Sequence, residues 1–295
     1  MTLPLVLSVT TLGRVEALRR LLGSLEGQLL PEDRVVLVAQ GRHAEVEALA
    51  AEFDAVLAGR ILVAASDRGA ALGRNTGIAS VAEAEDALLM FPNDTTWFPD
   101  GSIAAIRSHA TGAEAAAAAV VGTSGPRLVL PPEGTPLDRH TVWQVIEMGL
   151  VIRLRLFRRI GGFDESIGTG AASPWQAGEV TDLLLRALEL EPSLARSFVW
   201  IDPSVAHVRG IDEAAGLTPA DRRRKIRAYG RGIAHVYRVH RYPLWRRWAF
   251  VAAGAAIGIR RPDEYPLADG WWAALGRAEG TVGATVGGTR AAVDR

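Results

Sequence analysis

The feature that most constrains the fold is an alternation of two hydrophobic periods over the first hundred residues. Short, nearly continuous apolar runs alternate with stretches in which apolar residues recur at helical spacing. The runs predict strands at 3–9, 34–38, 60–64 and 87–91, and the stretches predict helices at 15–25, 44–53 and 71–81. Alternation at this pitch is typical of βαβ units, so we expect a parallel sheet whose strands are buried on both faces.

Polar side chains stand at or just past the carboxyl ends of these predicted strands. The four clusters are Thr10-Thr11, Gln40, Ser66-Asp67 and Asn93-Asp94. Each cluster alone would also suit a turn, because Asn, Asp and Thr satisfy local backbone groups. Ligands of open α/β sheets bind beyond the carboxyl ends of the strands, so four clusters at one rim indicate a binding site.

Beyond residue 100 the pattern is mixed. We expect strands at 115–121, 148–153 and 197–201, a proline-rich loop at 127–139 and a helix that begins at Gly178. Residues 213–279 are expected to form a helical extension, and residues 280–295, which are rich in Gly, Thr and Ala, a flexible tail.

Composition and missing motifs exclude several classes of function. The chain has no cysteine, which excludes disulfides, zinc–thiolate sites and a thiol nucleophile. Lys+Arg 33 balances Asp+Glu 33, so no global charge points to nucleic acid. A P-loop is absent, and no Gly-x-Gly-x-x-Gly turn follows the first strand. The N-terminus lacks a basic region and a cleavage site, so no signal peptide is predicted. Nothing in the sequence argues for export, and we expect a cytoplasmic protein.

A series of motifs in chain order carries a family resemblance. They are Ser8–Arg14, Gly69–Ile78, Phe91–Trp97, Gly161–Glu165, Gly178–Arg186 and His207. Their order and spacing resemble those of the inverting family 2 glycosyltransferases of the GT-A fold, which move a sugar from a nucleotide diphosphate to an acceptor hydroxyl. The resemblance covers about 3–210. It implies an α/β fold with a mostly parallel central sheet flanked by helices, followed by the C-terminal helical extension.

The resemblance also implies a domain plan and a donor site. A GT-A domain would span 1–212, with a nucleotide-binding half at 1–100 and an acceptor-binding half at 101–212. The donor would be a UDP- or TDP-sugar. The residues implied to border it are Thr10, Thr11, Arg14, Gln40, Asp67, Arg74 and Asn75. A guanidinium can make paired hydrogen bonds to phosphate oxygens, which favours this role for Arg74 over that of a solvated loop charge.

The Asn93-Asp94-Thr95 segment aligns with the Asp-x-Asp region of that family, where carboxylates hold Mg²⁺ or Mn²⁺ against the diphosphate. Hard cations prefer oxygen ligands, and here only Asp94 brings a charge, with the amide of Asn93 beside it. His207 resembles the downstream histidine that completes the metal site, although a lone histidine is also common in packing. We expect a weakly held divalent cation.

The chemistry needs a general base to take the proton of the acceptor hydroxyl. The position to which the family most often assigns this base corresponds to Val180. Glu179 and Asp182 remain, and their i, i+3 spacing places them on one face of the helix. We expect Glu179 to be the base and Asp182 a supporting or acceptor-binding group; the alternative is that both only complement the helix dipole. Trp175 would either stack on an acceptor sugar or anchor its loop.

The segment 218–247 is rich in arginine and predicts a helix or a helix pair. Such a helix could contact an anionic membrane from the cytoplasmic side, or could present a solvated basic face. The apolar run 248–259 is too short to span a bilayer.

Two functions follow from these observations. We expect a transferase that glycosylates a saccharide, a lipid-linked acceptor or a small molecule, as in the synthesis of cell-envelope polysaccharides. The alternative is a catalytically impaired relative that binds nucleotide-sugar or glycan, because Val180 and Asn93 depart from the pattern of the family.

Overall fold

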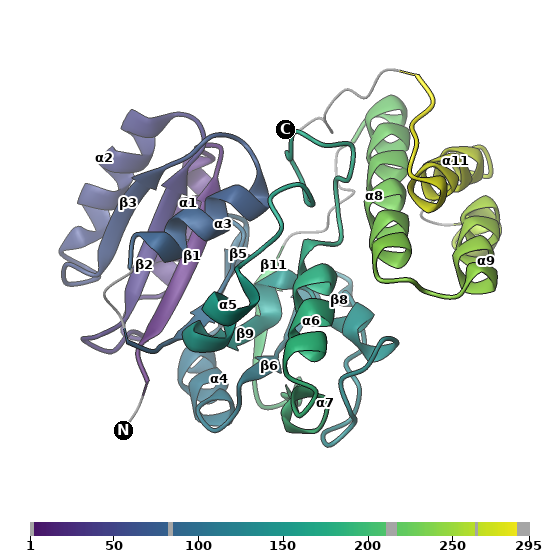
Figure 1. The fold of residues 1–295 in the computed structure, drawn as a ribbon. Helices are drawn as coiled ribbons and strands as arrows, with labels where there is room; N and C mark the ends of the chain where they lie inside the picture. The colour runs from purple at the N-terminus through teal and green to yellow at the C-terminus, as the bar shows by residue number, and fades with distance from the viewer. Residues whose placement is uncertain (1–2, 82–84, 211–216, 263–264, 288–295) are drawn as a thin grey trace. The chain divides into compact units, whose positions relative to one another are not determined.

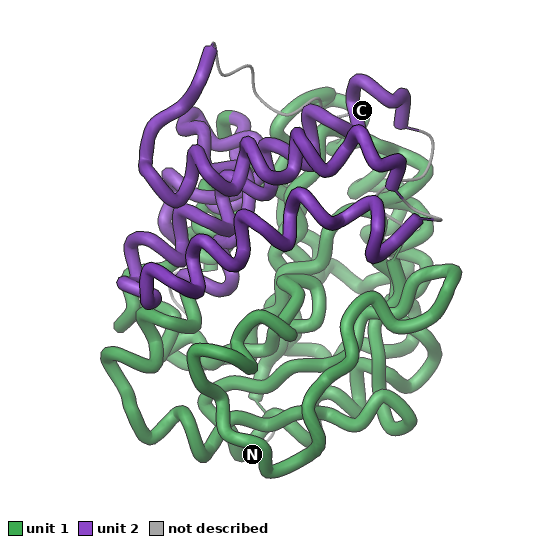
Figure 2. Tube along the Cα trace, turned by 90° about the vertical axis from the view of Figure 1, so that its right-hand side faces the viewer, with its two compact units in different colours: residues 1–67, 72–162, 183–212 green, residues 68–71, 163–182, 213–295 purple. Residues whose placement is uncertain are grey.

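The computed structural model describes residues 3–81, 85–210, 217–262 and 265–287. The chain divides into two compact units, which Figure 2 colours separately. The first unit comprises residues 1–67, 72–162 and 183–212. The second comprises residues 68–71, 163–182 and 213–295, so it is assembled from three separate segments of the chain.

A seven-stranded sheet forms the centre of the first unit (Figure 1), in the order β10-β6-β9-β4-β1-β2-β3. Its strands are β1 (Leu5–Thr11), β2 (Arg34–Ala39), β3 (Ile61–Ala65), β4 (Leu88–Met90), β6 (Ala115–Ala117), β9 (Leu150–Arg153) and β10 (Val199–Trp200). All neighbouring pairs are parallel except those of β9, which runs antiparallel to β4 and β6. The predicted mostly parallel α/β sheet is confirmed.

Helices cover both faces of this sheet. They are α1 (Val15–Ser24), α2 (His43–Asp54), α3 (Ala70–Ala79), α4 (Ser102–Ala110) and α5 (Leu154–Ile160). Side chains of α1, α2 and α4 share one buried cluster with Leu7 and Leu37 of the strands. On the opposite face, Gly77 of α3 lies against Ser8, and Phe157 of α5 packs on Phe91 with the ring centroids 5.5 Å apart. Burial on both faces explains why β1, β2 and β4 are continuous apolar runs, whereas the edge strand β3 is partly exposed although its sequence is equally apolar.

The run 115–121, predicted as one strand, is two strands in two different sheets. β6 pairs with β9 and β10 in the large sheet, whereas β7 (Ala119–Gly122) belongs to a four-stranded sheet of order β5-β11-β7-β8. The other members are β5 (Thr96–Trp97), β11 (His207–Gly210) and β8 (Gly125–Pro126). The chain changes from one sheet to the other at Ala118. Gly149 lies close to this point, and a side chain there would overlap the Ala118 carbonyl. A run of Ala and Val residues gives no local signal that the chain passes from one sheet to another.

The remaining short elements of the first unit connect these sheets. They are the 3₁₀ turns η1 (Thr141–Gln144) and η2 (Glu147–Gly149) and the helix α7 (Leu194–Ser197). Helix α6 (Glu179–Leu190) has its first turn in the second unit and its later turns in the first.

A buried ion pair joins the start of the large sheet to α4. Asp33 is fully buried, and its carboxylate accepts the backbone N–H groups of Leu5 at 2.8 Å and Leu30 at 2.7 Å. The guanidinium of Arg107 donates to the same carboxylate at 2.5 Å and to the carbonyl of Leu3 at 2.6 Å. Because hydrogen bonds hold both charges, removing either partner would leave the other buried without compensation.

The C-terminal part of the second unit is a set of four helices, α8 (Pro219–Val239), α9 (Leu244–Ala255), α10 (Ile257–Arg260) and α11 (Asp269–Val282). The segment 218–247 is therefore a helix followed by the start of another. Thr218 caps α8 by accepting the N–H of Asp221 at 3.2 Å, and Pro219 occupies the first turn, where its missing N–H costs nothing. Within the described ranges, every helix is too short or too polar to traverse a bilayer.

Four arginines of α8 are paired with two buried carboxylates of α11, so this part of the basic segment is not a solvated face. Arg222 and Arg223 donate to Asp269 at 2.7 and 2.9 Å. Burial would raise the pKa of Asp269, but these hydrogen bonds outweigh burial and hold the pKa below its usual value. Glu279 accepts in the same way from Arg227 and Arg231. The expected basic character of α8 is largely neutralised inside the unit.

Glycines allow α8 and α11 to approach closely. A side chain at Gly276 would overlap the carbonyl of Arg227, and one at Gly280 would overlap the carbonyl of Arg231. The two glycines are four residues apart and therefore share one face of α11. Residues 280–282 were predicted as part of a flexible tail, but they form the end of α11. Residues 288–295 of the predicted tail lie outside the described residues.

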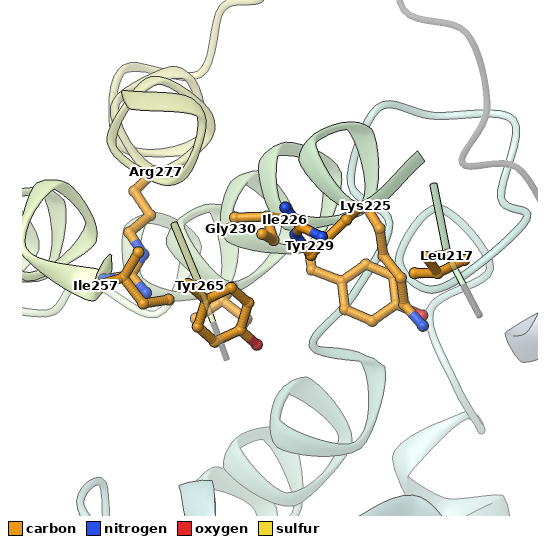
Figure 3. A pocket seen from close by; sticks show the side chains of 10 residues that line it. Leu217, Lys225, Ile226, Tyr229, Gly230, Ile257, Tyr265 and Arg277 are labelled. Carbon is orange, nitrogen blue, oxygen red and sulfur yellow. The ribbon is translucent and has the colours of Figure 1, made fainter. Parts of the chain in front are cut away.

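A cavity of about 170 Å³ lies among α8, α10 and α11. Figure 3 shows the side chain of Arg277 extending from α11 toward Ile257. Arg277 donates to the carbonyl of Phe250 at 2.8 Å and stacks over that ring, 4.0 Å from its centroid. Burial lowers the pKa of Arg277 to about 10, so the guanidinium is still charged at neutral pH.

Candidate functional site

The rim of the large sheet starts with a sharp turn after β1. Gly13 has a φ of 87°, and a side chain there would overlap Arg42, so glycine is needed. Thr11 closes the turn because its Oγ1 accepts the Gly13 N–H at 2.9 Å. The same hydroxyl donates to Oδ2 of Asp94 at 2.8 Å. The turn therefore links the ends of β1 and β4, as expected for adjacent parallel strands.

Asp94 is paired with Arg14. The carboxylate is fully buried, and the guanidinium donates from Nε to Oδ2 at 3.0 Å and from Nη2 to Oδ1 at 2.5 Å. Arg14 itself is about half exposed, with 45% of its side chain accessible. A buried carboxylate thus orients a cation that still faces solvent at the rim, which suits the recognition of an anionic ligand.

Another arginine, which is buried, lies beside this pair. Arg74 is 2% exposed and donates to Oδ1 of Asn93 at 3.2 Å. The amide of Asn93 donates in turn to Glu147 at 3.2 Å, and Glu147 lies 3.8 Å from the Arg74 guanidinium. Asn93 and Thr10 also form an isolated parallel bridge between the strand ends. Asn93 therefore connects Arg74 to the rim.

Gln40 and Asp67 form the part of the rim beyond β2 and β3. The amide of Gln40 donates to the hydroxyl of Ser66 at 3.0 Å and to the carbonyl of Asp67 at 2.6 Å, and the Asp67 side chain is exposed. Gly73 fits between Thr10 and Gln40, where a side chain would overlap both. A glycine in the first turns of α3 thus lets this helix approach the strand ends.

The structure brings together most of the predicted donor-site residues. Contacts at the rim connect Thr10, Thr11, Arg14, Gln40, Asp67, Arg74, Asn93 and Asp94. Asn75 has a different neighbour: its side chain lies against Gly162, where a Cβ would be 2.8 Å from the Asn75 Oδ1. His207 begins β11, with its Nδ1 3.3 Å from the Pro203 carbonyl.

The proposed metal ligands are not arranged as a metal centre. Nowhere in the described parts of the chain do three or more His, Asp or Glu side chains gather as a cation would need. Both oxygens of Asp94 already accept hydrogen bonds. Thr96, at the end of β5 nearest Asp94, pairs with Gly210 of β11. His207 precedes Gly210 by three residues, so it lies about 10 Å further along β11 from that point. The residues present do not fit a shared ion in this arrangement, and the cation stays a prediction.

The predicted acceptor-side residues belong to the second unit. Helix α6 follows Gly178, whose φ is 102° and whose Cβ would overlap Val236 of α8. Glu179 is 8% exposed, and a Cβ at Gly168 would lie 3.2 Å from its Cδ. Val180, at the position most often assigned as base in the resembling family, is buried as a core residue. The carboxylate of α6 that meets the loop at 168 is therefore that of Glu179.

Asp182 is paired with a histidine from the C-terminal helices. Nε2 of His240 lies 2.9 Å from Oδ1 of Asp182, and both side chains are buried. The distance is that of a hydrogen bond, with the proton on Nε2 when the ring is the donor. Asp182 is therefore positioned by a partner, which agrees better with a supporting role than with a base.

Residues 166–176 form a loop that hydrogen bonds to itself. The buried Gln176 accepts the N–H of Gly170 at 2.9 Å and donates to the carbonyls of Ala171 and Ser173 at 2.9 and 2.6 Å. Trp175 stacks on His235, with ring centroids 4.1 Å apart and an interplanar angle of 14°. One face of the indole thus anchors the loop to α8, and the sugar-stacking role of Trp175 stays a prediction.

His235 is held neutral at physiological pH. Burial is the main cause, and it lowers the pKa of His235 to about 4 with help from the charge of Arg238, whose guanidinium lies 3.0 Å from Nδ1. Asp164 and Asp182 act in the opposite direction, and His240 lowers the pKa slightly further. The stack with Trp175 is therefore between two uncharged rings.

Sequence reasoning missed three residues of these clusters: Glu147, His235 and His240. Glu147 is the only acidic residue between Asp138 and Asp164, and it directly precedes a predicted strand. This position was the one sequence signal that could have indicated Glu147. The two histidines lie in a segment whose arginines dominate its pattern, so nothing local indicated them.

Comparison with known proteins supports the fold. No family model and no curated protein sequence matches the chain. Among solved structures, TarS from S. aureus matches with a TM-score of 0.59 at 14% identity, over 94% of this chain and 80% of that chain. TarS in complex with UDP-GlcNAc matches with 0.56 at 14%, over 95% and 92%.

A third structure extends the comparison. It is the mannosyltransferase PcManGT from Pyrobaculum calidifontis in complex with GDP-Man and Mn²⁺, with a TM-score of 0.57 at 13% identity, over 95% of this chain and 86% of that chain. At such low identity the likeness establishes the fold, and the expected GT-A-type α/β arrangement is confirmed.

Proposed function

We propose that the chain transfers a glycosyl group from a nucleoside diphosphate sugar to an acceptor hydroxyl, with inversion at the anomeric carbon. The observation that carries this proposal is the rim at which Thr11 and Arg14 both donate to Asp94, beside Arg74 and Asn93. Ligands of α/β sheets bind at such a rim. Structures of the same fold hold UDP-GlcNAc and GDP-Man, which supports a nucleotide-sugar as the ligand.

The two arginines at the rim would bind the diphosphate. Arg14 is oriented by Asp94 and remains accessible, so its outward N–H groups can donate to phosphate oxygens. Arg74 is held by Asn93 and contributes positive potential from a buried position. As the bond to the sugar breaks, negative charge grows on the diphosphate, and cations fixed in advance stabilise it more than they stabilise the substrate. The donor is proposed to be a UDP- or TDP-sugar.

Glu179 is proposed as the general base. The acceptor oxygen attacks the anomeric carbon and forms the new C–O bond, while the bond from that carbon to the diphosphate oxygen breaks. The hydroxyl proton passes to the Glu179 carboxylate, and the nucleoside diphosphate leaves with the bonding electron pair. Asp182, paired with His240, would orient the first turn of α6 or bind the acceptor.

The proposed acceptor is a saccharide, a lipid-linked saccharide or a small molecule, and surface polysaccharide is one product that suits it. We also propose that the protein binds a divalent cation and acts on the cytoplasmic side of the membrane. The chemical step described above depends on neither proposal.

A binding protein without turnover is the second candidate. Two observations favour it: Val180 is buried as a core residue, and Asp94 is already neutralised by Arg14. Such a protein would bind the nucleotide-sugar at the rim and release it unchanged.

Release of nucleoside diphosphate from a panel of nucleotide-sugars, with and without Mn²⁺, separates the two candidates. We expect turnover by the wild type and a loss of about 10²- to 10⁴-fold in Glu179→Gln. Glu189→Gln is the matched control, because Glu189 is an exposed carboxylate on the same helix. Tight binding of a nucleoside diphosphate without any turnover would favour the binding protein, and full activity of Glu179→Gln would reject Glu179 as the base.

A further inference from the structure

Every exposed side chain of α9 is apolar. The exposed residues of this helix are Leu244, Trp245, Trp248, Ala249, Ala252 and Ala255. Three of them are large, with Trp245 72%, Leu244 64% and Trp248 51% accessible. At the helical rotation per residue, the six positions fall within an arc of about 140°. A helix face in contact with water normally carries polar side chains, so this face indicates a partner that is not water.

Close backbone packing brings further exposed apolar residues near the end of α9. Gly270 packs against the backbone of Ala255, and Gly258 packs against that of Leu267. These contacts bring α10 and the start of α11 next to the end of α9, as Figure 1 shows for α9 and α11. Further exposed apolar residues there are Ile259 at 72%, Leu267 at 71% and Trp271 at 68%. We call Leu244, Trp245, Trp248, Ile259, Leu267 and Trp271 the apolar surface.

The charge of the segment around α9 and α10 is mostly positive. The segment 240–264 contains five arginines against two acidic residues, Asp263 and Glu264. Arg241 precedes α9, and Arg260 and Arg261 follow at the end of α10; all three are exposed. Four arginines of α8, by contrast, are paired with carboxylates of α11. Exposed positive charge therefore flanks the apolar stripe at both of its ends.

We propose that the apolar surface binds the interface of an anionic lipid bilayer. Tryptophan side chains favour the level of the lipid headgroups because the ring is apolar and its N–H is polar. Arginines at the two ends of the helix would donate to lipid phosphates, and each basic residue near an anionic surface adds to binding. An amphipathic helix with this composition lies in the plane of the interface rather than across the membrane.

The charge pattern favours lipid over a second copy of this chain. Two copies that met through the apolar surface would bring net positive charge to the same interface, because the five arginines of 240–264 outnumber Asp263 and Glu264. Anionic headgroups supply that compensation. The proposal also differs from a contact through α8, most of whose arginines are paired with carboxylates, and it does not depend on the proposed enzymatic function.

Co-sedimentation of the full chain with vesicles tests the proposal. We expect binding to vesicles of phosphatidylcholine mixed with phosphatidylglycerol and little binding to phosphatidylcholine alone. The double variant Trp245→Gln/Trp248→Gln should lower the partition coefficient about tenfold or more, because two interfacial anchors are lost. Val129→Gln is the matched control: Val129 is 81% exposed in a loop of the first unit, and its replacement should change nothing.

A second variant tests the charge. Arg260→Glu/Arg261→Glu keeps the apolar surface and should lose the preference for anionic vesicles. All replaced side chains are exposed, so thermal unfolding should match the wild type. The proposal is overturned if the wild type ignores lipid charge, or if the tryptophan variant binds as well as Val129→Gln. A dimer in light scattering that the tryptophan variant converts to a monomer, without vesicle binding, would instead identify a second copy as the occupant.

Discussion

The neutral His235 ring makes stability depend on pH in a way that can be calculated. Its pKa is about 4 in the folded chain and 6.5 in the unfolded reference. Between these values the unfolded chain binds more protons than the folded one, so protonation favours unfolding. The contribution of His235 is therefore present above pH 6.5 and is lost as the pH falls through about 4.

The size of the effect follows from the two pKa values. Between pH 7 and pH 5, linkage gives a loss of about 2 kcal/mol in the free energy of unfolding from this one group. The variant His235→Gln cannot make this contribution, although its side-chain oxygen can still accept from Arg238. It should start less stable at pH 7, because the stack on Trp175 is lost, and should then fall by about 2 kcal/mol less than the wild type.

Urea denaturation followed by circular dichroism at pH 7 and pH 5 measures this difference. Other titrating groups are common to both proteins and cancel. His43→Gln is the matched control, because His43 is an exposed histidine on α2, and it should follow the wild type. If His235→Gln and the wild type lose the same free energy between the two pH values, the buried neutral ring is not the cause and the reasoning is refuted.

Three further substitutions test the rim and the two units. Arg14→Ala should weaken binding of a nucleoside diphosphate about tenfold in titration calorimetry. Binding should also become more dependent on Mn²⁺, because Asp94 loses its guanidinium partner. Asp33→Ala should cost about 3–5 kcal/mol in urea denaturation, since Arg107 is left buried without its anion. Gly276→Val should destabilise the α8–α11 pair by at least about 1–3 kcal/mol, measured in the same way, because the added side chain meets the α8 backbone.

Each of these substitutions has a control of related chemistry at an exposed position. Arg19→Ala removes an exposed arginine of α1 and should leave nucleotide affinity unchanged. Glu52→Ala breaks the exposed pair with Arg19 and should leave stability nearly unchanged. Gly23→Ala lies on α1 with no atom within 4 Å of the added carbon and should stabilise by up to about 1 kcal/mol. Equal effects in a substitution and its control would contradict the structural reason given for it.

The order of strands and helices in the first hundred residues could be predicted, because hydrophobic period is a local property. The meeting of these polar residues at one rim could be predicted for a related reason: residues that follow parallel strands must meet at one edge of the sheet, so Thr11 and Asp94 become neighbours once the strands are identified. Where the chain instead changes sheets, as at Ala118, the local pattern was misleading.

Contacts between residues far apart in the chain could not be predicted from the sequence. His240 and Asp182 are 58 positions apart, and neither local pattern indicates the other. The arginines of α8 could equally have faced solvent, a membrane or another helix, and only the packing of α11 decided that four of them pair with Asp269 and Glu279. The sequence by itself determined the sheet, its helices and the polar rim, because those depend on periodicity and strand direction. The tertiary structure alone decided which charges are neutralised and which apolar face remains exposed, because both depend on contacts between segments far apart in the chain.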